Sequence, residues 1–138
     1  MQTDTQAAPV SKKALWAGRI VSALVVVLLL LDSIGKLVKP APVVEGTVQL
    51  GYPESVIVGL GIVLMICTVL YAIPRTSVLG AILLTGYLGG AVATHVRVGN
   101  PLFTHVLFPV YLGVLIWVGL FLRDARLGAL IPLRSSSR

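Results

Sequence analysis

Four apolar runs, each about 20 residues long, fill most of this chain and limit what it can fold into. They cover residues 14–38, 53–73, 78–96 and 102–122. At a rise of about 1.5 Å per residue, a helix of this length crosses the roughly 30 Å hydrocarbon core of a bilayer. Backbone amides in lipid must be hydrogen-bonded internally, so such runs form helices. The sequence therefore predicts an all-α integral membrane protein, a four-helix bundle that spans residues 14–134.

The composition excludes several other classes of protein. Hydrophobic residues make up 57% of the chain and charged residues 12%, with a mean hydropathy of +0.97, which leaves no room for a separate soluble domain. The net charge is +6, but the basic residues lie at the ends of the apolar runs and form no single face, so no nucleic-acid partner is indicated. Cys67 is the only cysteine, which excludes dithiol chemistry within one chain.

The basic residues also predict an orientation, because cytoplasmic segments of membrane proteins are enriched in lysine and arginine. Eight basic residues fall on one side of the predicted bundle and three on the other. The eight are Lys12, Lys13, Arg19, Arg75, Arg123, Arg126, Arg134 and Arg138, and the three are Lys36, Lys39 and Arg97. We therefore expect an up-down-up-down bundle in the cell inner membrane, with both termini cytoplasmic and with disordered tails at residues 1–13 and 135–138.

A cleaved signal peptide is the competing interpretation of residues 1–32. It is disfavoured because the apolar run continues too far and no Ala-x-Ala cleavage site follows it.

The connections and small residues add detail. Residues 73–77 form a short turn in which Thr76 or Ser77 is able to cap the next helix. The long connection, residues 39–52, is either a short amphipathic helix over the outer mouth of the bundle or an extended loop. Gly86, Gly90 and Thr94 recur at every fourth position, a spacing that favours close helix packing. This face is expected to pack against glycines of the other helices, Gly59, Gly61 and Gly113, or between copies of the chain.

Five polar residues lie near the ends of the helices on the side with fewer basic residues: Asp32, Lys36, His95, Arg97 and His105. A carboxylate at membrane depth is costly unless paired, so Asp32 should face the bundle interior. Asp32 and Lys36 are one helical turn apart and form either a self-satisfied pair or one wall of a polar pocket. Arg97 also fits an interfacial side chain, and two histidines do not define a metal site, so none is predicted.

Pro109 predicts a bend near this cluster. Proline has no amide hydrogen, so the carbonyl of His105 loses its helical partner. Tyr87, in the middle of the third apolar run, is placed where it could face a cavity.

Several segments resemble the DoxX-like family of small four-helix bacterial membrane proteins. They are residues 35–46, 50–53, 86–97, 107–113, 122–127 and 131–134. The resemblance implies the four-helix fold. It also implies an association with membrane redox or stress functions, since the family takes its name from the small subunit of an archaeal thiosulfate:quinone oxidoreductase. It carries no catalytic residue onto a position of this chain.

The resulting hypothesis is that the outer polar cluster binds the head group of an apolar ligand such as a quinone. Asp32 or a histidine would exchange protons there, while Lys36 or Arg97 would steady a developing negative charge. The sequence has no motif for a redox cofactor, so any electron carrier would come from a membrane or redox partner protein, and catalysis itself stays open. The alternative is a non-catalytic subunit or assembly partner of another membrane protein.

Overall fold

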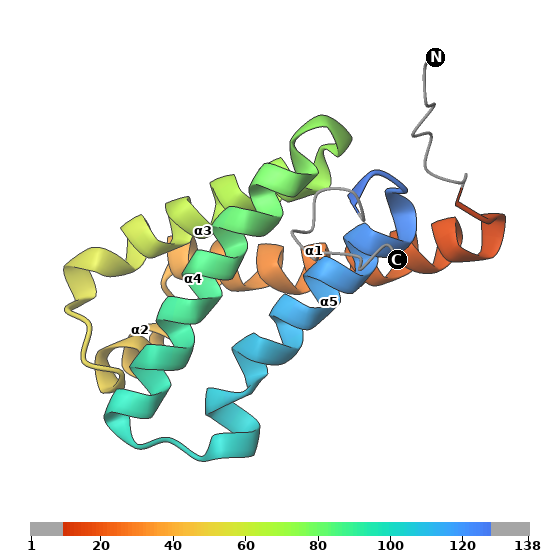
Figure 1. Cartoon of the computed structure of the whole chain (residues 1–138). Coiled ribbons are helices and arrows are strands. Elements are labelled where there is room, and N and C mark those ends of the chain that lie inside the picture. The colour runs from red at the N-terminus through yellow and green to blue at the C-terminus, as the bar shows by residue number, and fades with distance from the viewer. Residues whose placement is uncertain (1–9, 128–138) are drawn as a thin grey trace.

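The protein, described by a computed structural model over residues 10–127, contains four helices long and apolar enough to cross a membrane (Figure 1). The first is α1 (Lys12–Val38). The second joins a 3₁₀ turn, η1 (Glu54–Val56), to α3 (Ile57–Ala72), and the third joins η2 (Pro74–Thr76) to α4 (Ser77–Val98). The fourth joins a π-helical turn, η3 (Leu102–Val106), to α5 (Phe108–Arg123).

The predicted all-α, membrane-spanning class is therefore confirmed, and each span begins and ends within four residues of its predicted bounds. Within the described range the chain contains no strand. Residues 12 and 13, predicted as part of the N-terminal tail, are the first residues of α1. The remainder of the two predicted tails, apart from residues 10 and 11, lies outside the described residues.

A fifth helix, α2 (Ala41–Gln49), occupies the long connection, so the amphipathic helix is the correct one of the two interpretations. Pro40 precedes it at the N-cap, and Lys39 ends α1 in the left-handed conformation. Thr47 is buried and Val43 is half-buried, so this face of α2 turns toward the bundle.

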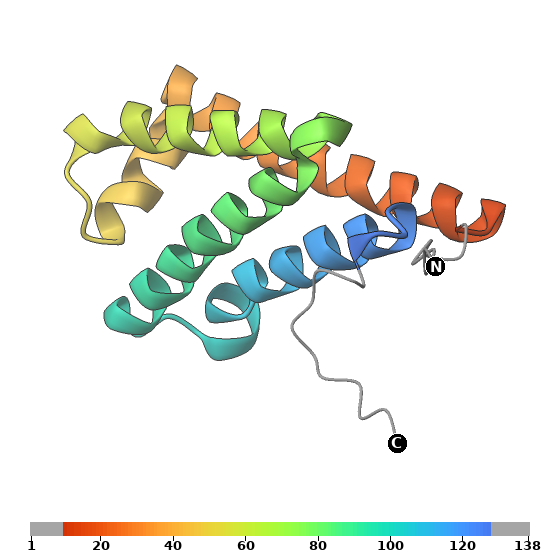
Figure 2. The same ribbon diagram turned by 45° about the horizontal axis from the view of Figure 1, so that its top comes forward.

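Helices α3 and α4 diverge from their common turn, and α2 lies in the opening between their far ends (Figures 1 and 2). Helix α1 packs against both α3 and α5, and α4 packs against α3 and α5. The core runs through the middle of all four spans, with fully buried side chains such as Val25, Leu64, Leu84 and Ile116. Large apolar side chains also cover the outer surface, as expected for helices surrounded by lipid.

The end of the bundle at the α3–α4 turn is closed by polar contacts around Tyr71, which is fully buried. Its hydroxyl donates to the carbonyl of Ile116 (2.8 Å) and lies 3.1 Å from Ser22 Oγ. A tyrosine hydroxyl has one hydrogen, so Ser22 must be the donor of the second bond. One phenol therefore links α1, α3 and α5.

Thr76 and Ser77 act at this end in a way that the sequence interpretation missed. Neither side chain caps α4. Instead, Thr76 Oγ1 donates to the carbonyl of Leu70 and Ser77 Oγ to that of Tyr71, both at 2.7 Å. These carbonyls at the end of α3 have no partner further along the helix. The two hydroxyls therefore stabilise the C-terminal end of α3 and not the start of α4.

The expected packing of the Gly86–Gly90–Thr94 face against another helix of the same bundle is wrong for the glycines. A Cβ at Gly86 or Gly90 would meet no atom within 4 Å. The close helix contacts use other glycines. Gly80 lies against the backbone of Tyr71, and Gly61 packs on α1, not on α4. The spacing correctly marks small residues, but it does not say which way the helix is rotated.

Candidate functional site

A cavity of about 680 Å³ lies at the end of the bundle where α3 and α4 have diverged. Its walls come from α1, α3, α4, η3 and α5, and residues of α2 and the following loop cover it. The polar lining residues are Asp32, Lys36, Thr47, Gln49, Tyr52, Tyr87, Thr94, His95, Asn100 and His105. The apolar lining includes Leu29, Val43, Leu60, Leu88, Phe108, Pro109 and Leu112. This combination of an apolar wall and a few polar groups is typical of small-molecule sites, which measure roughly 300–1,000 Å³.

Four of the five polar residues singled out from the sequence therefore meet at one cavity: Asp32, Lys36, His95 and His105. They come from three different elements, α1, α4 and η3. Tyr87 also lines the cavity, as its place in the third apolar run suggested.

Asp32 and Lys36 form an ion pair along α1, and both line the cavity. The two interpretations of this pair are thus compatible. The lysine side chain is the more enclosed of the two, at 14% exposure against 51% for the aspartate. The pair brings an acceptor and a donor to the wall with little net charge, which limits the cost of placing them at membrane depth.

His95 and His105 approach each other edge to face, with 5.8 Å between ring centroids. Each ring uses Nδ1 for a neighbour on its own segment. Asn100 Nδ2 lies 2.8 Å from His95 Nδ1, and Thr104 Oγ1 lies 2.8 Å from His105 Nδ1. The structure shows no partner for either Nε2 among the described residues. This nitrogen is therefore the one that each ring offers to a ligand or a proton.

The backbone around Pro109 explains how His105 reaches the cavity. Because Pro109 cannot donate to the His105 carbonyl, the regular helix starts only at Phe108. The preceding residues form the wider turn η3, in which Val106 N bonds to Pro101 O and Leu107 N bonds to Leu102 O. Where the sequence predicted a bend at Pro109, the structure has a break in the regular helix. Its form, a π-helical turn that carries a cavity residue, is common at functional positions.

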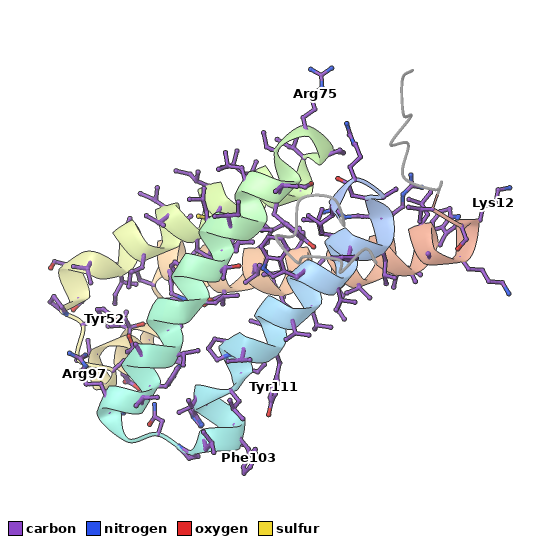
Figure 3. All side chains as sticks on the ribbon, in the orientation of Figure 1. Lys12, Tyr52, Arg75, Arg97, Phe103 and Tyr111 are labelled. Carbon is purple, nitrogen blue, oxygen red and sulfur yellow. The ribbon has the colours of Figure 1, made fainter. Side chains whose placement is uncertain are left out.

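The cover over the cavity is fastened at two points on α4. Tyr52 Oη lies 2.6 Å from Thr94 Oγ1, and Thr94 already donates to the Gly90 carbonyl, so Tyr52 is the donor. Arg97 Nη2 donates to the carbonyl of Leu50 (2.9 Å). Figure 3 shows Tyr52 and Arg97 beside α2, at the opposite end of the molecule from Lys12 and Arg75.

Arg97 is the one predicted site residue that does not line the cavity. Its guanidinium lies over Gly51, which has a φ of 92°, and holds the loop between α2 and η1. Arg97 therefore acts on the site only through the cover.

Two of the α4 residues that border the cavity have no side chain, beside lining residues such as Tyr87, Thr94 and His95. Gly86 and Gly90 are one turn apart and both line the cavity. The sequence interpretation assigned them to helix packing, and it missed Thr94, Asn100 and the residues of α2 as part of a site. The sequence did contain one signal for these missed residues. Asn100 and Tyr52 each lie next to the end of an apolar run, at the same predicted end of the bundle as His95.

The arrangement offers hydrogen-bond donors, acceptors and exchangeable protons next to an apolar chamber. Among residues 10–127, no group of three or more His, Cys, Asp or Glu side chains could hold a metal ion. The residues present fit a neutral or weakly polar head group attached to an apolar body.

The comparison with protein families agrees with the fold and the cavity. The family model of the DoxX-like family matches residues 20–119. The match begins in the third turn of α1 and ends within α5. The chain belongs to the DoxX-like family. Every residue that lines the cavity falls within the matched range, so the site of this DoxX-like protein is built from the part shared with the family. No curated protein and no solved structure matches the chain.

Proposed function

We propose that this DoxX-like membrane protein binds the polar head group of an apolar ligand of quinone or isoprenoid type in the cavity under α2. One observation carries the proposal: four polar residues that are separated in sequence line the same cavity of about 680 Å³. They are Asp32, Lys36, His95 and His105. Carbonyl or hydroxyl groups of a head group would pair with Lys36 and the histidine Nε2 atoms. The apolar wall of Leu29, Leu60, Leu88 and Leu112 would accommodate the rest of the ligand.

We further propose that the bundle is up-down-up-down, with both termini cytoplasmic and the cavity in the outer leaflet of the inner membrane. Two contacts support this arrangement. Gly18, near the start of α1, lies against Gly119 near the end of α5, and Arg123 reaches the α3–α4 turn at Tyr71. This end carries the excess of basic residues, which favours the cytoplasm.

The decisive experiment is to purify the full chain in a mild detergent and identify co-purifying small molecules by mass spectrometry. The wild type should retain a quinone or another isoprenoid. Asp32→Asn should lose most of it, because Lys36 is then left without its partner at the cavity wall. Unfolding followed through Cys67, which is buried in the core, checks that the fold is intact.

Glu54→Gln is the matched control for this experiment. Glu54 is a carboxylate at the same end of the bundle, lies 3.8 Å from Lys39, and does not line the cavity. It should retain the ligand at the wild-type level. If the wild-type protein carries no ligand and elutes with a second membrane protein, the result would instead favour the alternative that this chain is a non-catalytic subunit or assembly partner.

A further inference from the structure

A second, smaller pocket of about 230 Å³ lies at the opposite end of the bundle, on the side where α1, α3 and α5 meet. It is lined by Arg19, Ser22, Ala23, Val26, Tyr71, Ala72 and Arg123. Two arginines from different helices thus border one small pocket, next to a serine hydroxyl and an apolar strip formed by Ala23, Val26 and Ala72. The cavity under α2 shares no residue with it.

Within residues 10–127, neither arginine forms an ion pair with a carboxylate. The ion pairs found within residues 10–127 join Lys36 to Asp32, Lys39 to Glu54 and Arg126 to Asp124. Arg19 rests on Trp16, with its guanidinium carbon 5.5 Å from the ring centroid. In the part of the chain that the structure describes, no carboxylate lines this pocket.

Arg123 is held in place but incompletely satisfied. Its Nη2 makes only long bonds, 3.4 Å to the carbonyl of Tyr71 and 3.3 Å to Ser77 Oγ, and its guanidinium lies 5.1 Å from the Tyr71 ring centroid. Its Nε is buried without a hydrogen-bond partner in the described structure. An enclosed cation without a counter-charge is costly, and an anion in the adjoining pocket would offset that cost.

We propose that this pocket binds the phosphate group of an anionic phospholipid. The planar guanidinium is well suited to phosphate oxygens, and the guanidiniums of Arg19 and Arg123 would hold one phosphate, while the Ser22 hydroxyl stays bonded to Tyr71. The apolar strip of Ala23, Val26 and Ala72 continues the pocket along the helices, where the start of an acyl chain would lie. Trp16, the neighbour of Arg19, is a residue type enriched at the level of lipid head groups. Basic pockets between membrane helices bind such head groups in general.

Native mass spectrometry of the full chain in neutral detergent tests the proposal, with phosphatidylglycerol and phosphatidylcholine added separately. The wild type should bind phosphatidylglycerol about tenfold more tightly than phosphatidylcholine, as expected for paired arginines near a head group. Arg19→Gln should abolish most of this preference. Arg19 makes no hydrogen bond or ion pair to the described residues, so the change should leave the Cys67 unfolding midpoint in place.

Arg75→Gln is the matched control, because Arg75 is an exposed arginine at the same end that does not line the pocket. Arg75→Gln should change the preference for phosphatidylglycerol over phosphatidylcholine less than about twofold, because this charge acts on the lipid only through the surface potential. An equal loss in Arg75→Gln and Arg19→Gln would mean that net charge alone attracts the lipid, and the site would be refuted. The proposal also fails if the wild type shows no preference between the two lipids. In a further outcome, the pocket binds inorganic phosphate in a way that depends on Arg19 but shows no preference for phosphatidylglycerol. That result would assign the pocket to free phosphate and refute the proposal of a phospholipid.

Discussion

The glycines around Tyr71 and the glycines of the cavity wall serve opposite purposes. At the Tyr71 end, Gly18, Gly80 and Gly119 bring helices into contact, and any Cβ there would collide with a neighbouring helix or turn. At the cavity end, Gly61 also packs closely on α1, but the glycines of the cavity wall, Gly86 and Gly90, face open space. The same residue type therefore stabilises the fold by close approach around Tyr71 and creates room along the cavity wall. The difference separates positions that should control stability from positions that should control binding.

The largest expected effect is at Gly80. In Gly80→Ala, the new methyl group would fall on the backbone nitrogen of Tyr71, and backbone atoms at a helix turn have little freedom to move away. We expect a loss of at least about 3 kcal/mol in the free energy of unfolding, at the upper end of the cost of overpacking. Reaction of Cys67 with a thiol-specific fluorophore during heating measures it, because this single cysteine is buried in the core.

Gly86→Ala on the same helix is the control for this comparison. No atom lies within 4 Å of its new methyl group, and alanine is the better helix former, so the unfolding midpoint should stay the same or rise. Equal destabilisation by the two substitutions would break the distinction between the ends.

The next effect in size concerns binding. Gly90→Leu would place an isobutyl group in the cavity beside the polar residues, while the fold should tolerate it. We expect the co-purified ligand to fall more than about tenfold, with an unchanged Cys67 midpoint, since a filled chamber excludes the ligand by steric contact. Gly89→Leu is the matched change, because Gly89 meets nothing within 4 Å and does not line the cavity. Equal ligand loss in both variants would contradict a role for the glycine wall.

The smallest effect compares the same substitution at the two ends. Tyr71→Phe removes a buried hydroxyl that bonds to Ile116 and Ser22, and leaves both without that partner. It should lower the free energy of unfolding by about 1 kcal/mol. Tyr52→Phe removes the bond to Thr94 from the cover and should leave the midpoint unchanged. Instead, hydrogen exchange of the α2 amides should become faster. An unchanged exchange rate at α2 would mean that Tyr52 does not hold the cover closed.

The sequence was sufficient for the features that depend on composition and local chemistry. The four apolar runs located the spans, and Pro109 predicted a bend where the structure has the break before α5. For the long connection the sequence left two structures open, and the amphipathic helix was one of them. The sequence placed Asp32, Lys36, His95 and His105 at the same predicted end, but it left open whether they converge, and the structure brings all four to one cavity.

What the sequence did not reveal depends on how each helix is rotated about its axis. In a helix that is apolar on all sides, hydropathy does not show which face is inward. The Gly86–Gly90 spacing was therefore assigned to packing, although these residues border the cavity. Arg97 was grouped with the site although it reaches the loop at Leu50. Tyr71 was not singled out, because its partners on α1 and α5 are distant in sequence.

The wall formed by Gly86 and Gly90 has a consequence for how this protein can change over generations. A single base change converts a glycine codon to an alanine codon, and at these two positions the new methyl group would cost the fold nothing. Single substitutions at these positions can therefore change the shape of the cavity, and with it the ligands that fit, while the fold stays intact. The glycines around Tyr71 have no such freedom. Selection should therefore conserve the glycines around Tyr71 and tolerate substitutions at Gly86 and Gly90.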